Sequence, residues 1–149
     1  MDTTTDASSS TQPLTLELSR LRGYRVREIG FVLGRLRIRF ESPTGSSEQP
    51  LLECLVMPTV LKEHSIVSSD DERWAGALRE LIGQDVTETY EEQGIGLRLE
   101  LTYGSLRIHP RPSQRDGTAV ARLGDFGDGA RREWTSGVDC FADLHRELR

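Results

Sequence analysis

The sequence predicts an α+β domain, in which two tandem helix-glycine-three-strand repeats form a mainly antiparallel sheet, or two packed sheets, with helices on one side and a further helix at the C-terminus. Three observations lead to this prediction. Apolar residues recur at helical spacing before Gly23 and Gly83, apolar and polar residues alternate after each glycine, and the two segments align with one another. A chain of 149 residues is long enough for one domain with a sizeable core.

The first expected helix covers residues 14–22. Leu14, Leu18 and Leu21 are spaced by four and three residues, which places them on one helical face. Gly23 follows, where a helix commonly ends in the left-handed conformation that glycine adopts at the least cost. The sequence therefore predicts a short helix with a glycine stop.

Three strands are expected after this helix. Residues 24–31 form the first, and residues 35–40 form the second, because leucine, isoleucine and phenylalanine alternate there with three arginines. Residues 41–50 have the composition of a loop. Residues 51–57 are apolar on both faces, which predicts a central third strand.

The pattern then begins again. Residues 69–72 (Ser-Asp-Asp-Glu) form a capping box, and the apolar residues between Trp74 and Ile82 form one stripe of a second helix. Gly83 would end that helix. Three more strands are expected at residues 84–90, 97–101 and 105–109.

The two segments align with one insertion. The shared features are the apolar residues of the helix, its stop glycine and the inward positions of the strands. At an offset of 60, Leu18, Leu21, Gly23 and Val26 match Leu78, Leu81, Gly83 and Val86; at an offset of 61, Leu36, Ile38 and Phe40 match Leu97, Leu99 and Leu101. The chain is thus interpreted as a disordered tail (1–13) and a single domain (14–149). That domain comprises repeat one (14–57), repeat two (69–109) and a C-terminal extension (110–149), in which a short strand is expected at 118–123 and a helix at 137–148.

Composition excludes several classes of protein. No stretch approaches the roughly 20 apolar residues that cross a bilayer, and the N-terminus lacks the basic and apolar regions of a secretory signal. A cytoplasmic location is therefore expected. Two cysteines are too few for a disulfide scaffold, and Cys54 lies in an apolar run that predicts burial. Lys62 is the only lysine among 19 basic residues, a bias typical of a GC-rich bacterial genome.

No motif points to catalysis, so we expect a protein that is not an enzyme and has no cofactor or metal. The three histidines stand at no known spacing from a serine or cysteine, and no paired Cys/His ligands occur. Residues 124–129 (GDFGDG) lack the register of a calcium loop and are interpreted as a turn. If the chain were a hydrolase, His109 would be the candidate general base.

The distribution of charge is the main functional hint. Residues 14–40 carry seven arginines against two acids, a net +5, whereas residues 63–101 carry ten acids against three arginines, a net −7. Three interpretations remain open: ordinary solvated faces, self-complementary faces within the chain or across a dimer, and faces that bind a partner. The candidate partner-binding residues are Arg25, Arg27, Arg35, Arg37, Arg39, Asp85, Glu88, Glu91 and Glu92.

A resemblance rests on the second repeat. Trp74, the pattern Leu81-x-Gly83-x-x-Val86, an acidic turn, and the alternation from Leu97 to Ile108 resemble small actinobacterial domains of unknown function. They are also similar in style to small immunity proteins that neutralise polymorphic or contact-dependent toxins. The likeness covers roughly residues 70–110, with a weaker echo over 14–57. These motifs are structural, so the resemblance implies a fold and transfers no functional residues.

These observations favour a non-enzymatic protein-binding domain, in its most concrete form a toxin-immunity protein or similar stoichiometric inhibitor. Its partner would be a protein such as a toxin or nuclease, or a second copy of the chain, and not a membrane. The first alternative is a nucleic-acid-associated or regulatory module that uses the Arg-rich sheet face, although this face lacks interleaved aromatic residues. The second alternative is a small hydrolase or ligand-binding protein.

Overall fold

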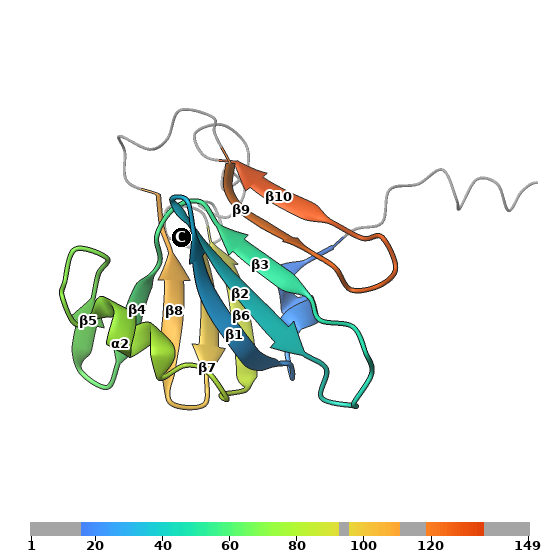
Figure 1. The fold of residues 1–149 in the computed structure, drawn as a ribbon, viewed down its shortest axis with the longest axis horizontal. Helices are drawn as coiled ribbons and strands as arrows, with labels where there is room; N and C mark the ends of the chain where they lie inside the picture. The colour runs from blue at the N-terminus through green and yellow to red at the C-terminus, as the bar shows by residue number, and fades with distance from the viewer. Residues whose placement is uncertain (1–15, 93–95, 111–118, 136–149) are drawn as a thin grey trace, which may run out of the picture.

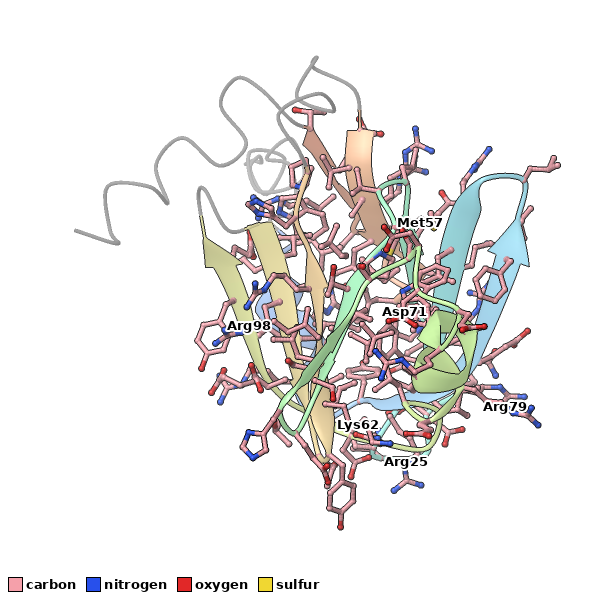
Figure 2. The ribbon with its side chains drawn as sticks, turned by 90° about the vertical axis from the view of Figure 1, so that its left-hand side faces the viewer. Arg25, Met57, Lys62, Asp71, Arg79 and Arg98 are labelled. Atoms are coloured by element: carbon pink, nitrogen blue, oxygen red, sulfur yellow. The ribbon has the colours of Figure 1, made fainter. Side chains whose placement is uncertain are left out.

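The computed structural model describes residues 16–92, 96–110 and 119–135, and it shows two five-stranded antiparallel sheets (Figure 1). The first sheet has the order β1 (Arg25–Val32), β2 (Arg35–Glu41), β3 (Leu51–Cys54), β9 (Ala119–Gly124) and β10 (Arg132–Thr135). The second has the order β5 (Ser65–Val67), β4 (Thr59–Lys62), β8 (Gly104–Ile108), β7 (Gly96–Leu101) and β6 (Val86–Glu92). Their inward side chains pack together between the sheets (Figure 2).

The α+β prediction is wrong, because the protein is mostly β. The first expected helix is only a four-residue 3₁₀ turn, η1 (Leu18–Leu21), and the second is the six-residue α2 (Trp74–Arg79). Neither has a side-chain cap at its N-cap residue, and Gly76 lowers the helix propensity of α2. Helices this short are marginal in water, so tertiary packing decided how much of each apolar stripe became helical.

The expected capping box is replaced by a turn. Ser68 O accepts the backbone N–H of Asp71 at 2.9 Å, and Asp71 Oδ1 accepts the backbone N–H of Arg73 at 2.8 Å. The chain therefore enters α2 five residues after Ser69. The expected glycine stops are confirmed in conformation, since φ is +90° at Gly23 and +94° at Gly83.

The strands follow the predicted alternation more closely. Leu36, Ile38 and Phe40 of β2 are buried, as are Leu97, Leu99 and Leu101 of β7. Strand β3 lies in the middle of its sheet, but it ends at Cys54 rather than residue 57, and β4, β5 and β10 were not predicted. The expected tail at 1–13 and helix at 137–148 lie outside the described residues.

The two sheets meet at a seam of four reciprocal backbone hydrogen bonds. The N–H of Gly23 donates to Val86 O and the N–H of Gly83 donates to Val26 O, both at 2.8 Å. The N–H of Val26 donates to Gln84 O at 2.9 Å, and the N–H of Val86 donates to Tyr24 O at 2.8 Å. Each bond becomes its counterpart when residue numbers shift by 60. The register of the following hairpin also breaks at the same place in both sheets, after Val26 and after Val86.

Candidate interaction surface

The predicted arginine face lies on the outer side of the first sheet, where the structure provides each arginine with a carboxylate. Glu53 of β3 contacts both Arg35, at 3.1 Å from Nη1, and Arg37, at 3.8 Å from Nε. Arg39 Nη1 contacts Asp125 Oδ2 at 3.1 Å and donates to the carbonyl of Gln49 at 2.8 Å. This face is a network of mixed charge.

The other two predicted arginines are paired as well. Arg25 Nε lies 3.0 Å from Asp85 Oδ1, and Arg27 Nη1 lies 3.8 Å from Glu41 Oε1. Arg25 and Asp85 are the one cation-anion pair that the structure brings together from within the predicted set of site residues it describes. Glu41, Glu53 and Asp125 were missed, although a single glutamate in the otherwise apolar run 51–57 was a signal that it faces a partner.

The predicted acidic residues are divided among different tasks. Glu88 pairs with Arg22, with Nε and Oε1 3.3 Å apart, and so joins the two blocks of opposite charge. Glu92 ends β6 opposite Gly96. The ion pairs Arg22–Glu88 and Arg25–Asp85 are contacts that self-complementary charge within one chain would make.

Glu91 instead faces inward and ties three elements together. Its Oε2 accepts the backbone N–H of Leu18 in η1 at 2.9 Å. Its Oε1 accepts the indole N–H of Trp134 in β10 at 3.1 Å and lies 3.2 Å from Arg132 Nη2. The carboxylate is therefore a structural anchor and is poorly placed to meet a partner.

The turn between β1 and β2 exposes apolar side chains that sequence reasoning did not select. Phe31 is 57% exposed, Val32 41% and Leu33 96%; we call these three residues the apolar turn. Leu33 has φ +41° and Gly34 has φ +80°, the two consecutive positive values that a two-residue type I′ hairpin requires. The signal in the sequence was the run of three apolar residues before Gly34, at a position expected to be a turn.

Trp74 of α2 packs against Phe31 of this turn. Its ring meets that of Phe31 edge-on, with centroids 5.7 Å apart, and its indole N–H donates to Pro58 O at 2.9 Å. Because the indole is fixed by a hydrogen bond, Phe31 rests on a rigid platform while more than half of its surface stays in water.

Next to the apolar turn, strand β1 has a free edge. The pair Val32–Arg35 closes the two-residue turn, so it exchanges both ladder hydrogen bonds, and Gly30–Arg37 does the same. The N–H and C=O of Ile29 and Phe31 therefore point away from β2. Within the described part of the chain no strand pairs with this side of them; we call these backbone groups the β1 edge.

The side chains that could take part in catalysis are not arranged as an active site in the described part of the chain. Cys54 is buried, and burial raises the pKa of its thiol, which keeps it protonated. His109 is exposed just after β8. Residues 124–129 form the expected turn, with Asp125 paired to Arg39 and Asp128 to Arg20. No group of three His, Cys, Asp or Glu that could hold a metal ion occurs among residues 16–92, 96–110 and 119–135.

Two surface hollows formed by the described residues are lined by charges of both signs. One of about 530 Å³ lies between α2 and the β4–β5 hairpin, where Lys62 pairs with Glu80. Another of about 430 Å³ lies over β3, β9 and β10, where Arg122 lies between Glu53 and Glu133. Neither combines an apolar lining with a few converging polar groups, as small-molecule sites do.

The structure and the comparisons with known proteins set the remaining limits. No helix in the described ranges is long and apolar enough to cross a membrane. The chain matches no family model, no curated protein and no solved structure, so the geometry alone supports what is proposed for its function.

Proposed function

We propose that this chain is a non-enzymatic protein-binding domain, and that its partner adds an extended segment to the β1 edge and covers the apolar turn. The observation that carries this proposal is the combination of unpaired backbone groups at Ile29 and Phe31 with the three exposed apolar side chains beside them. Strand addition needs both parts: backbone hydrogen bonds supply affinity, and side-chain contacts supply specificity.

Natural sheets usually protect a free edge with proline, lysine, a bulge or a covering segment. Strand β1 has a bulge only near its start, between Val26 and Glu28. Residues 29–33, which include the β1 edge, contain no charged residue and no proline. A hydrophobic edge left open in this way is either an aggregation hazard or a place where another chain docks. The apolar side chains of both sheets are otherwise packed into one core, so the open edge is a local exception, and we favour the second interpretation.

Leu33 adds further support, because its side chain is hardly buried by the part of the fold that the structure describes. A leucine at positive φ carries backbone strain of order 1–3 kcal/mol, and a side chain that is 96% exposed recovers none of it by burial. Asparagine or glycine would form the same turn at lower cost. An exposed leucine fixed on a rigid hairpin is well suited to fill a partner's pocket at the centre of an interface.

The most concrete form of this function is a stoichiometric inhibitor such as a toxin-immunity protein, acting in the cytoplasm by covering the surface of its target. The Arg-rich face gives less support to the nucleic-acid alternative, because all five predicted arginines have a carboxylate within 4 Å. The hydrolase alternative has no observation in its favour beyond the exposure of His109.

A displayed library of random linear peptides tests this function, and the selection does not require the partner to be identified first. We expect the folded chain to select extended peptides with alternating apolar residues. We expect Ile29→Pro to abolish their binding while Ile29→Ala retains it. Both substitutions remove the isoleucine side chain, but only proline also removes the backbone N–H that points outward. That N–H makes no hydrogen bond to β2, so its loss leaves the β1–β2 ladder intact. Leu33→Asp should weaken binding as well.

Two outcomes would overturn the proposal. One is a selection that yields no binder to the folded wild-type chain, and the other is a set of binders that Ile29→Pro and Leu33→Asp bind as well as the wild type. Light scattering distinguishes the occupant. A dimer that Ile29→Pro dissociates would show that a second copy, rather than a different protein, occupies the β1 edge.

A further inference from the structure

We infer that the outer face of the second sheet carries a phosphate-binding site centred on Arg98 and Arg107. This inference is independent of the proposed function, since it concerns the other sheet and a different ligand. It rests on how the strand register places these two arginines and on what surrounds their guanidinium groups.

The register aligns four side chains in one row across the outer face. Tyr90 of β6 lies opposite Arg98 of β7, Arg98 lies opposite Arg107 of β8, and Arg107 lies opposite Thr59 of β4. The neighbouring Leu97 and Leu99 are buried, so Arg98 projects away from the core, and Figure 2 shows it on the side of the second sheet that faces away from the first. Two guanidiniums therefore stand side by side on adjacent strands.

Like charges directly opposite one another destabilise an antiparallel pair. The corresponding row on the first sheet avoids this cost by alternating its signs: Arg37, Glu53, Arg122 and Glu133 follow one another across four strands. On the second sheet no acid separates Arg98 from Arg107. The same architecture thus neutralises one row with protein carboxylates and leaves the other with adjacent cations.

The two arginines differ in how far they are already engaged. Arg98 stacks over Tyr90, with Cζ 4.5 Å from the ring centroid, and its Nε lies 2.8 Å from Glu100 Oε2. Arg107 has no carboxylate partner in the described part of the chain, although it is half-buried. The Nε of Arg107 is buried and makes no hydrogen bond, and the Nε of Arg98 is buried with only the ion pair to Glu100; the Nε of Arg37 on the first sheet is likewise buried without a hydrogen bond. A half-buried guanidinium without a counter-charge loses part of its hydration, which a bound anion would compensate.

The chemistry of the row selects an oxyanion. A guanidinium presents its N–H groups as a planar fork that matches phosphate oxygens, and two adjacent forks suit a doubly charged group better than a chloride. Thr59, on the far side of Arg107, adds a hydroxyl that can donate to the same ligand. One face of the Tyr90 ring is already covered by Arg98. The site therefore binds a phosphate group, either free or within a nucleic-acid backbone.

Thermal unfolding in phosphate and in chloride at equal ionic strength tests this inference, because a ligand that binds only the folded state raises the midpoint. We expect phosphate to raise the midpoint of the wild-type chain above its value in chloride. Phosphate also stabilises folded proteins in general by exclusion from their surface, so the part of the rise that reports binding is the part that Arg107→Gln removes. Arg107→Lys, which keeps the charge and loses the fork, should retain some of that part. The affinity for phosphate measured by NMR titration should fall about tenfold or more in Arg107→Gln.

Arg79→Gln is the matched control. Arg79 is also an arginine for which the described residues supply no ion pair, and it lies on the far side of the molecule from Arg98 (Figure 2). The Arg79→Gln substitution removes the same charge as Arg107→Gln and should leave the effect of phosphate on the midpoint unchanged. Equal midpoints in phosphate and chloride for the wild type, a phosphate effect as large in Arg107→Gln as in the wild type, or an equal loss in Arg79→Gln and Arg107→Gln, would overturn the inference.

The source of the phosphate is distinguished with two further probes, a nucleoside monophosphate and a short single-stranded oligonucleotide. Binding of a nucleic-acid backbone should weaken steeply with salt and should exceed that of the monophosphate, because several phosphates release counterions together. Equal affinity for inorganic phosphate and the oligonucleotide would assign the site to a small phosphorylated ligand. Either result supports a phosphate site at Arg107, provided that Arg107→Gln abolishes the binding.

Discussion

Arg25 and Asp85 face one another across an isolated antiparallel bridge, with Arg25 Nε and Asp85 Oδ1 3.0 Å apart, and they stand at equivalent positions of the two halves of the chain. Four backbone hydrogen bonds surround this pair in a reciprocal pattern. The two sheets are thus joined where the aligned segments meet, and the opposite charges of those segments meet there as well.

This pair should contribute little to stability on its own. Both side chains are about half exposed, and exposed ion pairs are worth roughly 0–1 kcal/mol. We expect Arg25→Glu to lower the free energy of unfolding by about 1 kcal/mol or less, and the charge-swapped double variant Arg25→Glu with Asp85→Arg to restore it. Urea unfolding of the single and double variants measures the coupling. A double variant that is less stable than either single variant would contradict a direct ion pair.

Glu91 should matter far more than Glu88, although the sequence suggested the same role for both. Glu91→Ala leaves the indole N–H of Trp134, the backbone N–H of Leu18 and the Arg132 guanidinium without their common acceptor. Unsatisfied buried groups cost about 1–3 kcal/mol each, so we expect a loss of at least about 2 kcal/mol. Glu88→Ala removes one exposed ion pair and should cost less than about 1 kcal/mol. Urea unfolding compares the two, and equal losses would show that Glu91 is not an anchor.

Leu33→Asn should separate stability from binding. Asparagine tolerates positive φ better than leucine and is favoured before glycine in type I′ turns, so we expect the free energy of unfolding to rise by about 0.5–1 kcal/mol. The same change removes an exposed apolar side chain, so binding of selected peptides should weaken. A variant that loses both stability and binding would mean that Leu33 supports the fold.

Acid should destabilise the turn that leads into α2. The side chain of Arg73, and then its backbone N–H, donate hydrogen bonds to Asp71 and lower the pKa of that carboxyl from 3.8 to about 2. Because the folded pKa is lowered, the unfolded chain takes up the proton first. The stabilisation is therefore complete above about pH 4 and is lost as the pH falls towards 2.

Urea midpoints measured between pH 6 and about pH 2 test this expectation. In Asp71→Asn the midpoint should fall less on acidification than in the wild type, and Glu72→Gln serves as the control at the neighbouring carboxylate. Asp128 should contribute in the same direction, because the backbone N–H of Ala130, and then Arg20, lower the pKa of its carboxyl. An identical pH profile in Asp71→Asn and the wild type would rule out the contribution from Asp71.

Much of the candidate interaction surface could not be predicted from sequence, and the reason is that charge partners are set by register. Arg35 and Arg37 alternate visibly with apolar residues, but only the pairing of β2 with β3 shows that Glu53 lies between them. Glu91 belongs to an acidic run, and only the position of β10 shows that it points inward to Trp134. In both cases the decisive partner lies far away in sequence.

The local patterns of this chain determined its local structure. Alternation fixed which side of β2 and β7 is buried, since side chains on a strand point to opposite faces, and Gly23 and Gly83 take the positive φ that ends each short turn. The spacing of apolar residues before each glycine was compatible with a helix. It could not show that the helix would stop after one or two turns, because such short helices form only as far as packing supports them.

Tertiary structure decided everything that depends on two distant segments meeting. It joined residues 23–26 to residues 83–86 and neutralised the arginines of the first sheet. It placed Arg107 directly beside Arg98, and within the described residues Arg107 has no acidic partner. It also left the β1 edge open beside an exposed Leu33. Hydrogen bonds and ion pairs between strands depend on which strands become neighbours, and this order is set by burial of the whole core rather than by any one segment.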